Sequence, residues 1–188
     1  TSGLCEQRFE PVPVTRQATA NLHAGEELIV REAGADYAIR LRTREPSVIF
    51  TRSLQMAPNR MQRNLTSHAT TIARAITTRL NARRDGQFML YFPDLRANRE
   101  DRLVFEAGFP VSGATGNAAG FHLREIPEQQ VLSLIYDPSI HTIETAWRQL
   151  YSAALTQGFV PSHQGYIITH RGGGTSEYQL VVSERQSP

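Results

Sequence analysis

Two stretches of the chain carry apolar residues at the three- and four-residue intervals of an amphipathic α-helix. The apolar positions of the first stretch are Leu65, Ala69, Ile72, Ile76 and Leu80. Those of the second are Ile143, Trp147, Leu150 and Ala154, and the stop residues Gly158 and Pro161 follow. The pattern predicts two helices, each with one face buried against the rest of a domain.

The ends of the first helix are predicted from capping residues. Asn64 and Thr66 have side chains suited to an N-cap. Arg83 and Arg84 suit the negative end of the helix dipole, and Gly86 is expected to end the last turn. We therefore expect the first helix to run from about residue 64 to just before Gly86.

Short segments rich in β-branched and aromatic residues predict two sets of strands. The first set covers residues 38–41, 48–52, 87–92 and 103–105. The second covers residues 121–124, 131–136, 165–169 and 177–182. The glycines at 172–174 predict a hairpin turn between the last two strands.

The two sets resemble two copies of one strand, strand, helix, strand, strand unit. Each copy opens with two strands joined at a proline, Pro46 in the first and Pro127 in the second. Glu106 and Glu177 occupy equivalent places in the last strand of each copy. The first copy is expected to carry a loop about 12 residues longer before its helix. The copies cover about 37–112 and 120–184, and residues 113–119 form a glycine-rich linker.

We therefore expect one α+β domain over residues 35–188, built from the two copies of the unit. The chain of 188 residues is long enough to bury one core. Residues 1–34 lie outside the repeat. They are expected to form an N-terminal arm or an extra strand near residues 28–30, with no role assigned.

Charge is unevenly distributed along the chain. It contains 20 arginines and no lysine. Residues 1–102 carry 16 arginines against 11 acidic residues, whereas residues 103–188 carry 4 against 7. The arginines of the first half are interspersed with acids and lack interleaved aromatics, which favours a solvated surface over a nucleic-acid interface.

Several classes of protein are disfavoured by the sequence. The single cysteine, Cys5, excludes an intramolecular disulfide and fits a reducing compartment. The histidines lack the helical spacing of a metal site, and the glycine runs lack the features of a phosphate loop. No apolar run is long enough for a membrane span. We expect a cytoplasmic domain without metal or cofactor, and the start at Thr1 leaves open a preceding DNA-binding domain.

A series of short motifs carries a resemblance to a known family. In order, they are Glu106-Ala-Gly-Phe-Pro-Val111, Leu123-Arg-Glu-Ile-Pro127, Ala146-Trp147-Arg-Gln-Leu150, Gly158 and Thr175-Ser-Glu-Tyr-Gln-Leu-Val-Val182. Over roughly residues 37–184 the chain resembles the GyrI-like family, the effector-binding domains of bacterial transcription activators of the BmrR type, whose fold is related to that of the SOUL proteins. The resemblance implies two pseudo-symmetric halves that form a curved antiparallel sheet, with two long helices on one side and a central ligand cleft.

The resemblance implies recognition of bulky aromatic, often cationic, compounds through aromatic walls and a buried glutamate, in transcriptional regulation or in toxin and drug sensing. The residues expected to contact the ligand are Tyr91, Glu106, Tyr136, Trp147, Gln164, Tyr166 and Glu177. Family members often have glutamate where this chain has Gln164. Preference is therefore expected to shift toward neutral ligands unless Glu106 or Glu177 supplies the charge.

Three other functions stay open beside small-molecule binding. Some relatives are hydrolases of reactive cyclopropane-bearing toxins, in which case Glu177, Glu106 or Tyr166 would activate water. The domain could instead inhibit a protein partner such as gyrase through its surface. Haem binding is disfavoured because no histidine is clearly placed as an axial ligand. We assign no catalytic residue and favour a binding domain over an enzyme.

Overall fold

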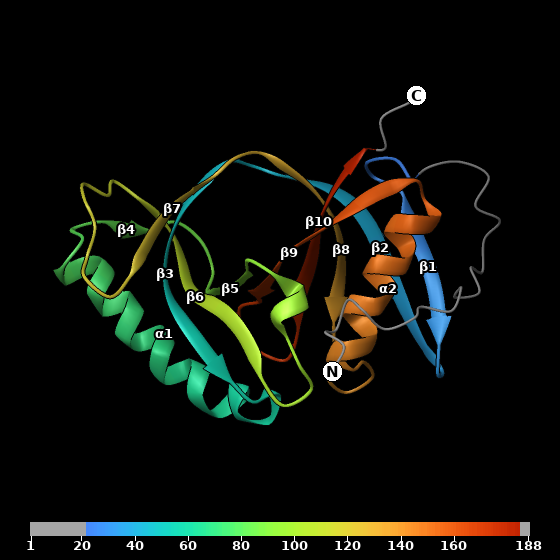
Figure 1. Ribbon diagram of the computed structural model, residues 1–188, viewed down its shortest axis with the longest axis horizontal. Helices are drawn as coiled ribbons and strands as arrows, with labels where there is room; N and C mark the ends of the chain where they lie inside the picture. Colours follow the sequence, from blue (N-terminus) through green and yellow to red (C-terminus); the bar gives the residue numbers. More distant parts are fainter. Residues whose placement is uncertain (1–21, 185–188) are drawn as a thin grey trace.

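A computed structural model describes residues 22–184 and has the predicted α+β fold, with ten antiparallel strands in one curved, open sheet and two α-helices (Figure 1). The strands are β1 (Glu27–Glu32), β2 (Ala35–Arg44), β3 (Ser47–Met56), β4 (Arg83–Arg84), β5 (Met89–Phe92), β6 (Leu103–Ser112), β7 (His122–Ile126), β8 (Gln129–Tyr136), β9 (Phe159–Thr169) and β10 (Ser176–Glu184). The helices are α1 (Met61–Thr78) and α2 (Ile143–Thr156), with 3-10 turns η1 (Pro58–Arg60) and η2 (Leu95–Ala97). β1 is the expected extra strand.

The order of the strands shows two related halves. Hydrogen-bonded neighbours follow the order β1-β2-β8-β10-β9-β5-β6-β3-β7, and β4 pairs with β6. The two halves meet where β5 pairs with β9. On either side of this pair the order is the same: β6, β3 and β7 on one side correspond to β10, β8 and β2 on the other. The predicted duplication is therefore present in the sheet.

The first strand of each copy is exchanged between the halves. β2 precedes β3 in the chain but pairs with β8, and β7 precedes β8 but pairs with β3. Figure 1 shows the two connections, β2 to β3 and β7 to β8, arching side by side over the top of the molecule. Each half of the sheet is thus built from both sequence repeats, so neither repeat is a separate compact unit.

Both helices cover the same face of the sheet and bury the main core. α1 contributes Ile72, Ala75 and Ile76, as its periodicity predicted. In α2, Trp147 lies at the centre of the buried face, and its ring packs on β9. A Cβ atom at Gly165 would lie 2.7 Å from this ring, so glycine is required there for the indole to approach the strand.

The predicted ends of α1 were wrong. The helix begins three residues before Asn64, because the 3-10 turn η1 leads directly into it, and its N-cap residue Arg60 makes no side-chain capping bond. It ends at Thr78, and Asn81 adopts a positive φ of 51° just beyond. Residues 83–84 form β4 rather than the end of the helix. The end of α2 was predicted correctly, since Gly158 follows it with a φ of 80°.

The expected long loop before the first helix is also absent from the structure. Only residues 57–60, which include η1, separate β3 from α1, whereas residues 137–142 separate β8 from α2. The additional length of the first copy comes after the helix, where residues 79–88 lead to β5. In the second copy only residues 157–158 lie between α2 and β9. The sequence spacing placed the insertion on the wrong side because Gly86 was taken as the end of α1, which ends at Thr78, and because β3 was predicted to end at residue 52 and not at Met56.

Candidate ligand-binding site on the helix-free face of the sheet

The face of the sheet opposite the helices has its own buried cluster. Its apolar members are Ile49, Met89, Tyr91, Ile126, Val131, Tyr166 and Val181, with Ile168 against them. No helix within residues 22–184 packs on this side, and we call it the helix-free face. Side chains alternate between the faces of a strand, so these residues and their cross-strand partners share one surface.

The sheet itself buries the helix-free face by curling around it. Arg44 in β2 reaches Met89 in β5, with 3.9 Å between Nη2 and Sδ. Three strands, β8, β10 and β9, lie between β2 and β5. In a flat sheet these positions would be about 19 Å apart, which is beyond the reach of an arginine side chain. The contact therefore requires strong curvature, and the helix-free face is concave.

Two stacked tyrosines lie at the centre of this face. Tyr91 and Tyr166 are directly opposite each other in the β5–β9 pair, and their ring centroids are 5.4 Å apart at an interplanar angle of 23°. The hydroxyl of Tyr166 donates a hydrogen bond of 2.7 Å to Oε1 of Gln129. Burial raises the pKa of Tyr166 to about 12. Burial also raises the pKa of Tyr91, and the charge of Glu106 adds to that effect.

Glu106 is buried beside Tyr91 and is fully paired. Arg124 in β7 donates from Nε and Nη2 to the two carboxylate oxygens, each at 2.8 Å. Thr51 in β3 donates from Oγ1 to Oε1 at 2.6 Å. The hydrogen bond to Glu106 raises the pKa of the Arg124 guanidinium, which is therefore a permanent counter-charge.

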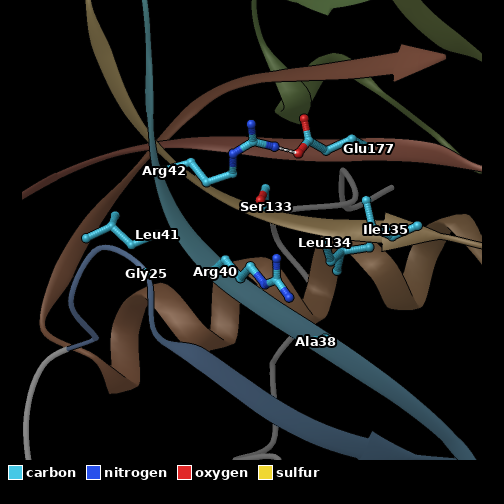
Figure 2. A pocket seen from close by; sticks show the side chains of 9 residues that line it. All are labelled: Gly25, Ala38, Arg40, Leu41, Arg42, Ser133, Leu134, Ile135 and Glu177. Atoms are coloured by element: carbon cyan, nitrogen blue, oxygen red, sulfur yellow. Dashed lines mark hydrogen bonds and ion pairs between the residues drawn. The ribbon is translucent and has the colours of Figure 1, made fainter. Parts of the chain in front are cut away.

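Glu177 is buried in the other half and has a corresponding arrangement. Nη1 of Arg42 in β2 donates to Oε1, and Nε2 of Gln179 donates to Oε2 at 2.6 Å. Figure 2 shows this ion pair at the edge of a hollow of about 490 Å³ that is formed by β2, β8 and β10 together with Gly25. The carboxylate is thus close to a space large enough for a small organic molecule.

The two ion pairs are related by the pseudo-twofold arrangement of the sheet. Arg124 lies opposite Ile49, which lies opposite Pro110 in the strand of Glu106. Arg42 lies opposite Val131, which lies opposite Val181 in the strand of Glu177. The registers match residue for residue, so Glu106–Arg124 and Glu177–Arg42 are equivalent. The backbones of the two glutamates are three strands apart, about 14 Å across the sheet.

Arg44 breaks this symmetry, because the equivalent position in β7 is the apolar Ile126. The guanidinium carbon of Arg44 lies 4.1 Å from the centroid of the Tyr166 ring. Nη1 donates to Oε1 of Gln179 at 3.2 Å, but Nε is buried without a hydrogen-bond partner. Burial lowers the pKa of Arg44, and Tyr166 and Glu177 oppose that effect. A positive charge of the protein itself therefore covers one tyrosine face.

Four of the seven residues expected to contact a ligand come together here: Tyr91, Glu106, Tyr166 and Glu177. Gln164 belongs to the same strand as Tyr166 but lies in a bulge, where its backbone bonds with Ser162. Tyr136 and Trp147 lie on the helix side, where both rings contact Tyr178. Tyr136 and Trp147 therefore cannot contact the same ligand as the four residues on the helix-free face. Ligand contact by any of the seven stays a prediction.

The basic half of this site was missed at the sequence level. Arg42, Arg44 and Arg124 were treated as solvated charges, although Arg42 and Arg44 alternate with apolar Leu41 and so had to share one face of their strand. Arg124 lies two residues before Ile126 and also shares its face. The alternation was visible in the sequence. Which face was buried, and which strands lay beside it, depended on the strand exchange.

The raised pKa of Tyr166 predicts a loss of stability in alkaline solution. Its ordinary pKa is about 10. The folded chain therefore holds the phenol proton more tightly, and this contribution is intact below about pH 10 and is lost as the pH rises to about 12. Tyr166 alone should remove roughly 2–3 kcal/mol from the free energy of unfolding in this window. In Tyr166→Phe the alkaline decline measured by denaturant unfolding should be shallower, and an unchanged decline would contradict the assignment.

Comparison with solved structures agrees with this α+β architecture. No family model and no curated protein matches the sequence. Among solved structures, the C-terminal domain of EcmrR superposes with a TM-score of 0.60 at 12% identity, over 79% of this chain and 99% of that one. EcmrR in its DNA complex, EcmrR-RPo, gives 0.65 at 12% identity, over 79% of this chain but only 58% of the EcmrR chain.

A third solved structure has a different described role. The hydrolase encoded by lin2189 from Listeria innocua has a TM-score of 0.50 at 12% identity, over 77% of this chain and 91% of that one. At such identities the likeness concerns the fold.

Within residues 22–184, neither helix is long and apolar enough to cross a membrane. In the same residues, no group of three or more His, Cys, Asp or Glu side chains is placed so that it could hold a metal ion.

Proposed function

We propose that this chain is a small-molecule-binding domain whose ligand lies on the concave, helix-free face, in the hollow beside Glu177 and on the side of Arg44 and the stacked tyrosines. The observation that carries the proposal is the pair of symmetric Glu–Arg contacts on either side of Tyr91 and Tyr166, in which each glutamate is buried and each arginine is partly exposed. Burying an ion pair contributes little net stability. Charged groups held in a concave aromatic surface are, in contrast, typical of ligand sites.

The ligand we propose is aromatic and neutral or anionic rather than cationic. Glu106 and Glu177 are each already neutralised by an arginine. Arg44 adds a further positive charge and covers the Tyr166 face on which a cationic ligand would stack. A cation would have to displace Arg44 and meet three guanidinium groups. A carboxylate or carbonyl oxygen of the ligand would instead accept a hydrogen bond from the unpaired Nε of Arg44.

A matched set of ligands tests this proposal. The compounds 2-naphthoate, 2-naphthylmethanol and 2-naphthylmethylammonium share one ring system and differ in charge. We expect naphthoate to bind most tightly and the ammonium compound least, measured by calorimetry and by the fluorescence of Trp147. Arg44→Met should weaken naphthoate binding by about tenfold to a hundredfold, since a hydrogen bond to a charged group is worth about 1.5–3 kcal/mol.

The control for this variant is Arg171→Met, which removes one positive charge from the exposed turn between β9 and β10. It should leave the order of affinities unchanged. If the native chain prefers the ammonium compound, the proposed anionic ligand is wrong, but the proposed location of the site still holds. Failure of all three compounds to bind would count against the concave face as a ligand site, and would favour the alternative of an interaction protein that inhibits a partner through its surface.

Hydrolysis is the second candidate, favoured by the position of Glu106 next to Tyr91 and by the structural likeness to the Listeria hydrolase. A general base needs a free lone pair directed at water or substrate. Both carboxylates already accept several hydrogen bonds, so binding without turnover is the better-supported function. Incubation of the protein with an ester of 2-naphthoate separates hydrolysis from binding without turnover. Only an enzyme would release 2-naphthoate from the ester faster than the spontaneous hydrolysis in buffer.

We further propose that ligand binding serves regulation, with a DNA-binding part supplied by a neighbouring domain or a partner. The likeness to EcmrR, whose structure is a complex with DNA, supports this role. The domain should then bind its ligand without DNA.

A further inference from the structure

Residues 46–84 contain seven arginines and no acidic residue. This segment forms β3, η1, α1 and β4. Its counterpart in the second repeat is different, because α2 has Glu144 in its first turn and its Arg148 is paired with Glu32. The surface around α1 is therefore basic, and this property does not follow from the pseudo-symmetry of the fold.

Three of these arginines line one groove, which lies between α1, β3 and the turn before β7 and has a volume of about 420 Å³. Arg52 comes from β3, Arg74 from α1, and Arg79 is the C-cap residue of α1. Arg52 is half-buried, and Arg74 and Arg79 are exposed. The rest of the lining is formed by Thr71, Thr78 and Phe121 together with alanine and glycine residues. Among residues 22–184, no side chain that lines the groove carries a carboxylate.

The three arginines have no acidic partner within the described part of the chain. The ion pairs there belong to Arg40, Arg42, Arg96, Arg124 and Arg148. Arg79 instead lies with its guanidinium carbon 6.0 Å from the centroid of the Phe121 ring. The charge of Arg52 acts on His68, whose pKa is lowered first by burial and further by Arg52. The groove thus holds three positive charges that nothing in residues 22–184 neutralises.

The C-terminus of α1 opposes this potential only weakly. A helix end carries about half a negative charge on its free carbonyl groups. Here the Ala75 oxygen accepts from the amides of Arg79 and Leu80, and the Ile76 oxygen accepts from Ala82. Three full charges therefore outweigh the dipole, and the groove is positive overall.

We propose that this groove binds a small phosphorylated compound through Arg52, Arg74 and Arg79. The planar guanidinium group matches the oxygens of a phosphate and donates two hydrogen bonds to it. The volume lies in the range of small-ligand pockets. A hollow between three elements suits a small ligand better than duplex DNA, which is read by a protruding helix or ribbon. The site is separate from the helix-free face, because Arg52 lies on the opposite side of β3 from Thr51.

The test is calorimetric titration of the full chain with pyrophosphate and with ATP at low ionic strength, where such contacts are least screened. We expect saturable binding of both probes and competition between them. The double variant Arg74→Gln/Arg79→Gln should weaken pyrophosphate binding by about tenfold or more. The matched control Arg60→Gln/Arg63→Gln removes two charges from the start of the same helix, outside the groove, and should change affinity by less than about twofold.

Two further arms make the result decisive. Arg44→Met should keep pyrophosphate binding, so this proposal and the proposed ligand site on the helix-free face can fail independently. An equal loss in both double variants, or the absence of saturable pyrophosphate binding, would overturn the proposal. Tight binding of a duplex DNA without binding of pyrophosphate would also overturn it and identify the basic surface as a nucleic-acid contact. Unchanged melting temperatures of the variants establish that they are folded.

Discussion

Gly108→Ala is expected to lower the free energy of unfolding by more than about 3 kcal/mol and to leave little folded protein at physiological temperature. A Cβ atom at Gly108 would lie 1.9 Å from the backbone oxygen of Phe50 and 2.8 Å from Cα of Thr51. Both contacts are with backbone, which no change of rotamer can relieve. The strands β6 and β3 would have to separate in the middle of the sheet, next to the Thr51–Glu106 hydrogen bond.

The control is Gly113→Ala in the linker after β6. Gly113 has a φ of 75°, and a Cβ atom added there would meet no other atom within 4 Å, so only backbone strain is introduced. This should cost about 1–2 kcal/mol. Denaturant unfolding, or the yield of folded protein, measures the difference. Equal stability of the two variants would show that β6 can move away from β3 at low cost, and would contradict the close approach of the two strands.

Arg124→Met should destabilise the fold by about 2 kcal/mol, because it leaves the buried Glu106 with a single hydrogen-bond donor, Thr51. Breaking a fully buried pair costs about 3–5 kcal/mol. The value here is reduced because the Arg124 side chain is 41% exposed, whereas that of Glu106 is 5% exposed, so water screens part of the interaction. Unfolding in urea measures the change.

A double-mutant cycle identifies the cause. Glu106→Gln in the Arg124→Met background removes the unpaired charge and should recover part of the lost stability. Arg40→Met is the matched control, because it breaks the Arg40–Glu27 pair, whose side chains are 61% and 34% exposed, and should cost less than about 1 kcal/mol. Equal costs for Arg124→Met and Arg40→Met would mean that Glu106 is solvated in solution, and it would then be a poor candidate for a ligand site.

The equivalence of Glu106 and Glu177 shows how far a repeat in the sequence can be used. Their matching positions, four residues before Pro110 and four before Val181, predicted equivalent places, and the strand registers place them so. The spacing along a strand is a local property, since each residue advances the chain by a fixed distance and reverses the direction of the side chain. The alternation likewise placed Tyr166 and Tyr91 on strands, although it did not predict that they would face each other.

The partners of the two glutamates were not predictable from either repeat alone. Arg124 reaches Glu106 only because β7 pairs with β3 of the other repeat, and Arg42 reaches Glu177 only because β2 pairs with β8. A repeat treated as an independent unit would have paired β2 with β3. The sequence left a cationic and a neutral ligand open, and the placement of these arginines moves the proposed ligand toward neutral or anionic.

The sequence by itself determined the two helices, nearly all strands, the duplication and the equivalence of the two glutamates, because periodicity, turn residues and repeat spacing act over a few neighbouring residues. The tertiary structure alone decided which strands exchange partners, that the sheet curls until Arg44 reaches Met89, and that three unpaired arginines line one groove beside α1. These features join residues far apart in the chain. They depend on the burial of both sheet faces and the neutralisation of buried carboxylates, which are properties of the whole fold.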